Sequence, residues 1–225
     1  MLSLRNPYIS VAYDGGDSFG GMQQRSSDPV IAKCGCGVIA AMDTLLYLSR
    51  FHADCGIEEF KSIKAAESVS PELYEKLIGA LAKRYLPLIP PFGMNGVALA
   101  LGFDLFLLRH GLPLRARWGV SREKLWTRME EMLAADMPVI LSIGPDFPRF
   151  WQRNQAPLYV RREDGRYVKA AETRAHYVVA VGMDERWIEL ASWGRRYFLD
   201  RREYMEFADR HTTNMLSNIL YIRHT

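Results

Sequence analysis

The sequence predicts an α+β fold in which an N-terminal helical half packs against a C-terminal antiparallel β-sheet. Between residues 37 and 135, apolar residues recur at three- and four-residue spacing, as they do on one face of a helix. After Asp136 the apolar residues instead form short, nearly continuous runs, which are typical of buried strands. Helices followed by strands indicate the α+β class. We expect one domain over 1–225, with a mainly helical lobe over 1–135 and a mainly β-sheet lobe over 136–225.

The individual elements follow these two patterns in order. The first 33 residues are rich in Gly, Ser, Asp and Gln and show no period, so we expect irregular structure there. Helices are predicted over 37–51, from Pro71 to about residue 84 behind a Ser70 N-cap, over 95–110 and from Ser121 onward. Strands are predicted over 138–143, 176–182, 187–191, 195–199 and 216–222, with a short helix near 201–209.

Composition and charge exclude several classes of protein. With 29 Lys+Arg against 26 Asp+Glu, the 225-residue chain carries a formal net charge of only +3. Its basic residues never run longer than a pair such as Arg161-Arg162. A nucleic-acid partner, which requires a concentrated basic surface, is therefore not expected. A chain of this length, 48% of it hydrophobic, can bury a core without a disulfide or a structural metal.

The N-terminal residues and the cysteines indicate where the protein works. Residues 1–8 lack the basic stretch and apolar run of a secretory signal. The longest uncharged stretch, 85–103, is interrupted by prolines and glycines, so we expect no membrane-spanning helix and no membrane partner. Three cysteines, an odd number close together, do not form a disulfide framework. We expect a cytoplasmic protein, and the oligomeric state stays open.

Two residues stand where a nucleophile and its base would lie. Cys36 begins the first predicted helix between two glycines, where the helix dipole and free backbone N–H groups lower the pKa of a thiol. His176 begins an apolar strand 140 residues later. A neutral imidazole is the base that a thiol needs. Taken singly, Cys36 could be a small buried side chain and His176 an ordinary surface or core residue; the combination indicates thiol chemistry.

The surrounding residues resemble the papain-like cysteine peptidase superfamily, and in particular its bacterial families with a Cys-Gly-x-x-Ala motif. Residues 36–40 read Cys-Gly-Val-Ile-Ala, residues 176–184 read His-Tyr-Val-Val-Ala-Val-Gly-Met-Asp, and 187–194 end in Ala-Ser-Trp-Gly. The order and the spacing agree with a papain-like enzyme over about residues 18–200. The resemblance implies that Cys36 attacks a peptide or another acyl or amide carbonyl, with His176 as base, through a thioester and without a cofactor.

The same resemblance assigns supporting roles and exposes departures. Papain-like enzymes orient the histidine with an Asn, but Ala191 stands at that position, so Ser192 or Glu189 would orient His176 instead. A Gln upstream of the nucleophile stabilises the oxyanion in this family. Gln23, 13 residues before Cys36, is preferred here over Gln24. Two cysteines two residues apart, with Gly37 after the second, differ from true papains and favour the bacterial type.

Other functions were weighed against this one. If an amine replaced water, the same residues would make an acyltransferase, and loss of the orienting Asn is also compatible with a non-catalytic binding module. Cys34, Cys36, His52 and Cys55 have zinc-ligand chemistry. A helix over 36–51 would separate its two ends by about 22 Å, too far for one tetrahedral site, so no metal is expected. Ser142 lacks the glycines of a nucleophile elbow and is interpreted as a core residue.

Overall fold

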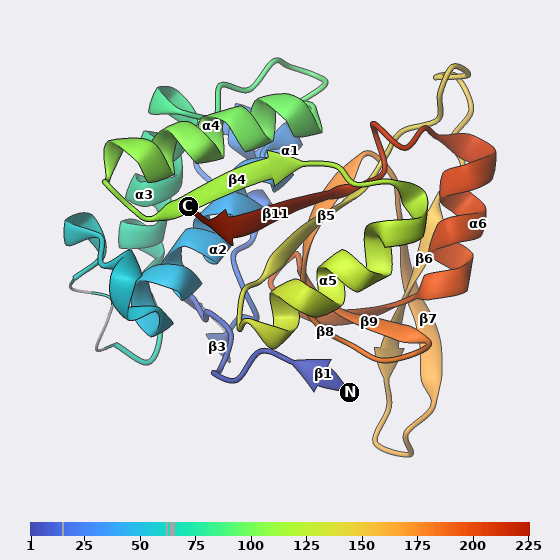
Figure 1. Cartoon of the computed structure of the whole chain (residues 1–225), viewed down its shortest axis with the longest axis horizontal. Coiled ribbons are helices and arrows are strands. Elements are labelled where there is room, and N and C mark those ends of the chain that lie inside the picture. Colours follow the sequence, from blue (N-terminus) through green and yellow to red (C-terminus); the bar gives the residue numbers. More distant parts are fainter. Residues whose placement is uncertain (15, 62, 64–65) are drawn as a thin grey trace.

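A computed structural model describes residues 1–14, 16–61, 63 and 66–225 of the chain. Helices from the first half of the chain gather at one end of a large antiparallel sheet, and two further helices pack along it (Figure 1). The predicted mixture of helices with an antiparallel sheet is confirmed at this level. In the described part of the chain, no helix is both long and apolar enough to cross a bilayer.

The predicted helices form close to their predicted limits. They are α2 (Cys36–Phe51), α3 (Pro71–Arg84), α4 (Gly96–Arg109), α5 (Leu125–Ala134) and α6 (Arg201–His211). The capping signals explain the starts of two of them. The Ser70 hydroxyl accepts a hydrogen bond from the Leu73 N–H at 3.3 Å, and the Asn95 side chain accepts one from the Ala98 N–H at 2.8 Å.

The N-terminal segment is more ordered than its composition predicts. Residues 29–34 form a short helix, α1 (Pro29–Cys34), so the prediction of irregular structure up to residue 33 is wrong there. The Asp28 carboxylate caps this helix by accepting from the Val30 N–H at 2.7 Å, with Pro29 at the first helical position. One and a half turns are too few for a hydrophobic period to appear in the sequence. Short strands β1 (Leu2–Ser3), β2 (Ala12–Tyr13) and β3 (Gly16–Asp17) and a 3-10 turn, η1 (Gln23–Arg25), complete the segment.

The main sheet has the strand order β4-β11-β5-β8-β9-β10-β6-β7, with β1 added beside β8. Four predicted strands appear, as β5 (Val139–Ile143), β8 (His176–Met183), β9 (Trp187–Ser192) and β10 (Arg195–Asp200). The predicted strand at 216–222 is displaced toward the C-terminus and forms β11 (Ile219–His224). Besides the short strands of the N-terminal segment, β4 (Leu114–Trp118), β6 (Ala156–Arg161) and β7 (Tyr167–Thr173) were not predicted.

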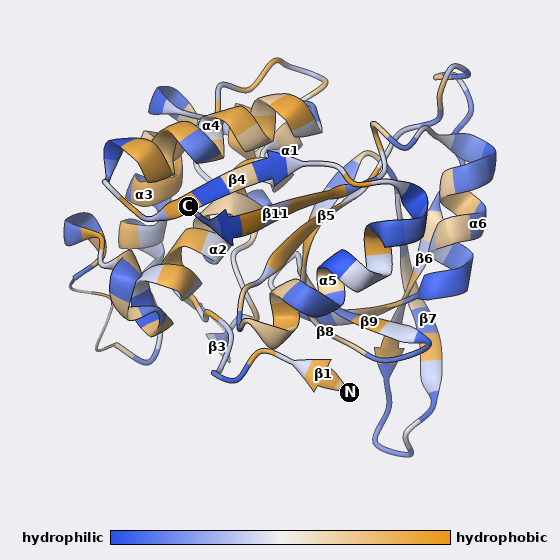
Figure 2. Ribbon diagram, in the orientation of Figure 1, coloured by the Kyte–Doolittle hydropathy of each residue, from blue (hydrophilic) through white to orange (hydrophobic). Residues whose placement is uncertain are grey.

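The core positions the segments that carry the candidate site. Helix α2 is buried along nearly its whole length and packs against β8 and β5. Hydrophobic residues concentrate on α2, α4 and β5, whereas α6 is mostly hydrophilic (Figure 2). All five residues of β5 are buried, and the last of them, Ile143, pairs with His176 at the start of β8. The packing therefore fixes the start of β8 relative to α2 through rigid, buried backbone.

Candidate functional site

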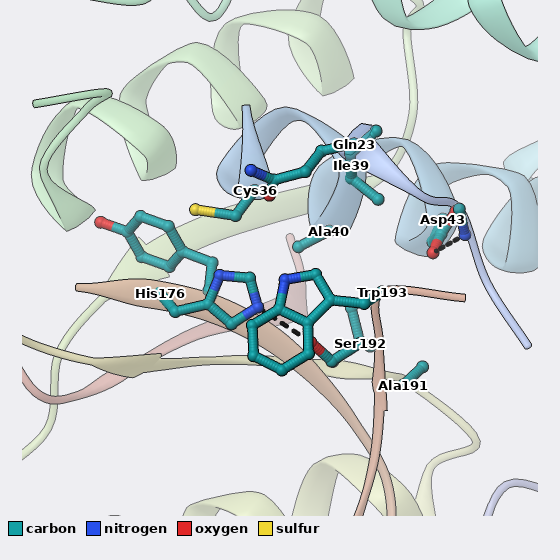
Figure 3. Close-up of a pocket in the computed structure, with 12 residues that line it drawn as sticks. Gln23, Cys36, Ile39, Ala40, Asp43, His176, Ala191, Ser192 and Trp193 are labelled. Carbon is teal, nitrogen blue, oxygen red and sulfur yellow. Dashed lines mark hydrogen bonds between the residues drawn. The ribbon is translucent and has the colours of Figure 1, made fainter. Parts of the chain in front are cut away.

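The start of α2 and the strands β8 and β9 line a small cavity, in which about 20 Å³ is open to the centre of a water-sized molecule. Figure 3 shows the residues that line it, and they include all four residues singled out from the sequence. The lining residues are Gly21, Gln23, Cys36, Ile39, Ala40, Asp43, His176, Tyr177, Val179, Ala191, Ser192 and Trp193. The fold thus brings Gln23 and His176, which are 153 positions apart in the chain, to the same cavity.

Cys36 is the first residue of α2 and is half-buried. Gly35 joins the end of α1 to the start of α2, and a Cβ atom on it would lie 2.5 Å from the Ile31 carbonyl oxygen. Only glycine can therefore occupy this junction without displacing α1. On the other side, a Cβ on Gly37 would lie 3.2 Å from the Tyr177 ring. The two glycines noticed in the sequence allow α1 and β8 to approach the thiol closely.

The environment of Cys36 acts on its thiol in two directions. Burial raises the pKa of Cys36, while hydrogen bonds from the backbone N–H groups of Tyr177 and Gly37 lower it. Burial is the larger effect, so the net pKa shift is upward. The sequence predicted that backbone N–H groups would lower the pKa of this thiol. They do lower it, but burial raises it by more. The resting residue is a neutral thiol with backbone donors around its sulfur.

His176 is buried at the start of β8, and its surroundings fix the ring. Its Nε2 atom lies 2.8 Å from the Ser192 hydroxyl oxygen, and the Trp193 indole stacks on it at 4.6 Å between ring centroids. Burial lowers the pKa of His176 to about 4, so the imidazole is neutral near pH 7. When Nε2–H donates to Ser192, Nδ1 keeps a free lone pair. In Figure 3 this second ring nitrogen lies on the side that faces Cys36.

The structure distinguishes between the two residues that could replace the missing Asn. Ser192 lines the cavity and bonds to His176. The Glu189 carboxylate instead pairs with the Arg196 guanidinium at 3.0 Å and does not line the cavity. Ala191 lines the cavity too, but its methyl group cannot form a hydrogen bond with the imidazole.

The stacking residue Trp193 was part of a recognised motif but received no role from the sequence. Trp193 and Gly194 form the turn between β9 and β10, with φ angles of 50° and 70°. Two consecutive residues in the left-handed region are typical of the tight hairpin turn that matches strand twist. This turn places the indole over the imidazole, while a Cβ on Gly194 would lie 2.3 Å from the Met22 side chain.

Gln23 lies at the cavity, whereas Gln24 is exposed and does not line it. The side-chain amide of Gln23 donates from Nε2 to the Ala32 carbonyl oxygen of α1 at 3.2 Å. A primary amide has a second N–H on the same nitrogen, which remains available to a substrate oxygen. The backbone N–H of Cys36, at the first position of its helix, also has no intrahelical acceptor.

Among the described residues, Asp43 is the one carboxyl group that lines the cavity, and the sequence did not point to it. It lies on α2, seven residues after Cys36, and is 3% exposed. Its carboxyl oxygens accept from the Tyr74 hydroxyl at 2.7 Å and from the Gly21 N–H at 2.9 Å. Burial raises the pKa of Asp43 to about 7 in spite of these two bonds. A single acidic residue within the apolar run 37–48 was the available signal.

The other cysteine–histidine grouping lies at the opposite end of α2. His52 follows the helix and its Nε2 atom lies 2.8 Å from the Asp136 carbonyl oxygen, while Cys55 is fully buried. Among the residues that the structure describes, no group of three or more His, Cys, Asp or Glu side chains is placed to hold a metal ion.

The cavity combines a thiol at a helix start, a neutral imidazole with one directed nitrogen, and amide donors beside the sulfur. These are the three components that acyl transfer through a thioester requires. Comparison of the chain with protein-family models, with curated proteins and with solved structures yields no match.

Proposed function

We propose that the protein is a cysteine peptidase, or a related thiol hydrolase of acyl and amide bonds, with Cys36 as nucleophile and His176 as base. The observation that carries the proposal is the His176–Ser192 hydrogen bond at the cavity that Cys36 also lines, because it leaves the second ring nitrogen free on the side of the thiol. The resemblance of the Cys-Gly-x-x-Ala and Ser-Trp-Gly segments to papain-like peptidases supports the same assignment.

In the proposed reaction, the Cys36 sulfur attacks the carbonyl carbon while its proton moves to Nδ1 of His176. The oxygen of the tetrahedral intermediate accepts hydrogen bonds from the Cys36 N–H and the Gln23 Nε2–H. The intermediate collapses to a thioester as His176 returns the proton to the leaving amine. Water, deprotonated by His176, then attacks the thioester and releases the acid and the free thiol.

The pKa directions determine when the proton moves. Burial raises the pKa of the thiol and lowers that of the imidazole, so a resting thiolate–imidazolium pair is unfavourable. The proton therefore transfers during the attack, as it does when a serine is the nucleophile, rather than before substrate binds.

A second candidate function has an observation in its favour. Ala191 cannot hold the imidazolium that forms in the reaction, and the resting pair is neutral. Both features suit a binding module that retains the cavity without the chemistry. An acyltransferase uses the same thioester and differs only in the group that accepts the acyl chain.

The test uses p-nitrophenyl acetate, which acylates an activated thiol and releases coloured p-nitrophenolate whatever the natural substrate. We expect a burst of one equivalent of p-nitrophenolate in the parent and no burst in Cys36→Ser. The matched control is Cys34→Ser, which removes another half-buried thiol two residues away and should keep the burst. A peptide mixture read by mass spectrometry then separates hydrolysis from acyl transfer, since a transferase would attach added glycine amide to most new C-termini, whereas a hydrolase would leave mainly free carboxyl groups. A parent without a burst would establish the binding module instead.

A further inference from the structure

We infer that Asp43 is a positioning residue for the oxyanion donors: its buried carboxyl group holds the segment 20–23 against α2, and so places Gln23 at the cavity. The inference rests on the proposed function and deepens it, because it assigns a role in acyl transfer to a residue whose hydrogen bonds go to Gly21 and Tyr74 rather than to the thiol or the imidazole.

The contacts of Asp43 join three separate parts of the chain. Its carboxyl group accepts from the backbone N–H of Gly21 in the N-terminal segment and from the hydroxyl of Tyr74 on α3. Both bonds are buried, and both are short enough to be strong, at 2.9 Å and 2.7 Å. A side chain on the helix of the nucleophile therefore fixes the backbone two residues before Gln23.

The two glycines of this segment are explained by the same contact. A Cβ on Gly20 would lie 2.6 Å from a carboxyl oxygen of Asp43, and one on Gly21 would lie 1.9 Å from the Tyr74 hydroxyl. Gly20 also has a φ angle of 81°, in the left-handed region. Only a Gly-Gly pair lets the backbone lie this close to the carboxyl group.

From Gly21 the position is transmitted to Gln23 through one residue, Met22. The Met22 N–H donates to the Tyr13 hydroxyl at 3.2 Å, and Gln23 begins the 3-10 turn and donates to the Ala32 carbonyl oxygen. These neighbouring bonds orient the turn, but neither ties it to α2. Among the described residues, the Asp43–Gly21 contact is the side-chain hydrogen bond that joins this segment to the helix beginning with Cys36.

A buried carboxyl group is a costly way to fill this space. Its neighbours along α2, Met42, Thr44 and Leu45, are each 1% exposed or less, and a leucine would suit such surroundings without desolvating a polar group. A carboxyl group has two oxygens that can accept from Gly21 and Tyr74 at once, which no apolar side chain can do. Asp43 can therefore hold the segment 20–23 in place, which an apolar residue at this position could not do.

The test separates two reactions of the same sulfur. Alkylation of Cys36 by iodoacetamide is a displacement at a saturated carbon and forms no oxyanion, whereas acylation by p-nitrophenyl acetate passes through one. If Asp43 places the oxyanion donors, Asp43→Leu will slow acylation by about 10-fold or more and leave the alkylation rate within about 2-fold. Asp43→Asn will restore most of the acylation rate, because its carbonyl oxygen can accept from Gly21 while its amide donates to a rotated Tyr74 hydroxyl.

Two further variants keep the test decisive. Thr44→Val is the matched control, since Thr44 is buried on the same helix, bonds only to Ala40 within it and does not line the cavity. It should change neither rate. Tyr74→Phe removes one of the two hydrogen bonds to Asp43 and replaces Asp43→Leu in the test if that variant does not fold. It should slow acylation less than Asp43→Leu does. It should still slow acylation more than alkylation.

The outcomes separate this inference from the proposed function. A parent that acylates normally, together with an Asp43→Leu or Tyr74→Phe variant whose acylation and alkylation are equally affected or equally unaffected, would overturn the role of Asp43 alone. A parent that shows no acylation burst would overturn both. Selective loss of acylation in the leucine variant, with recovery in the asparagine variant, is the result that the structure leads us to expect.

Discussion

The two ends of α2 carry the same residue types in different settings. At its start, Cys36 is half-buried at a cavity, with backbone N–H groups beside the sulfur. Beyond its end, Cys55 is fully buried, and burial together with the neighbouring Asp54 raises the pKa of its thiol to about 12. The two histidines differ in position: His176 lines the same cavity as Cys36, whereas His52 does not line it and its Nε2 atom bonds the Asp136 carbonyl oxygen. We therefore expect access and neighbouring donors, rather than residue type, to make the proposed Cys36–His176 pair reactive.

Replacing the proposed base, His176, should change the acylation rate of Cys36 more than any other substitution near the start of α2. His176→Ala removes the only group that takes the thiol proton in the proposed reaction, and we expect acylation of Cys36 by p-nitrophenyl acetate to slow by roughly 10²- to 10³-fold. Release of p-nitrophenolate under single-turnover conditions measures this rate. His52→Ala is the matched change at the other end and should leave it unaltered; equal losses in both variants would remove the distinction between the two ends.

The two thiols should differ in the folded protein and converge when it unfolds. At pH 7.5 we expect iodoacetamide to label Cys36 at least about 100-fold faster than Cys55, because Cys55 is inaccessible and has little thiolate. Peptide mass spectrometry of time points gives both rates from one sample. In urea the rates should become similar, and equal rates in the native protein would contradict the comparison.

The site end of the helix should also make stability depend on pH in two opposing ways. The folded pKa of Asp43 is raised to about 7 from 3.8, so its contribution to stability is present at low pH and lost as pH rises toward 7. The folded pKa of His176 is lowered to about 4 from 6.5, so its contribution is lost as pH falls toward 4. At about 1.4 kcal/mol per pKa unit, the shift corresponds to ~4.5 kcal/mol for Asp43 and ~3.5 kcal/mol for His176.

Between pH 4 and pH 6.5 these two contributions cancel in the parent, and single variants should separate them. The free energy of unfolding of Asp43→Asn should rise with pH relative to the parent, and that of His176→Ala should fall. Urea denaturation at several pH values measures both. Parallel curves for the parent and both variants would show that neither group titrates as its burial implies.

Ser192 and Glu189 should differ by a smaller factor. Ser192→Ala removes the hydroxyl that orients His176 but leaves Trp193 stacked on the ring, so we expect acylation to slow by about 10-fold. Glu189→Gln alters a residue paired with Arg196 away from the cavity and should stay within about 2-fold. Steady-state ester hydrolysis gives the comparison. A larger loss in the glutamine variant would identify Glu189 as the orienting residue.

The fold was predictable where a regular pattern was long enough to show. The predicted limits of α2 to α4 are close to those observed because their apolar periods and their Ser70 and Asn95 caps are local signals. Strands β6 and β7 form a hairpin with many half-buried and exposed residues, so they show no continuous apolar run. In strand β4, Arg115 and Arg117 interrupt the apolar residues, so it also shows no continuous apolar run, and it lies within the mainly helical half.

The site was predictable as a set of residues but not as a set of contacts. Cys36 and His176 could be named because each stands at the start of a regular element. The sequence favours Gln23 over Gln24 but does not choose between Ser192 and Glu189, because that choice depends on which side chain turns toward the cavity. Asp43 escaped notice because its meaning comes from Gly21 and Tyr74, which are distant in the chain.

The most direct test of the central claim is to trap the acyl group on Cys36. The parent is mixed with p-nitrophenyl acetate, quenched in acid after seconds and after minutes, and digested for peptide mass spectrometry. We predict an acetyl group on Cys36 within seconds, its loss as turnover continues, and neither event in His176→Ala. An acetyl group that never forms on Cys36, or one that forms equally fast without His176, would contradict the assignment of these two residues as nucleophile and base.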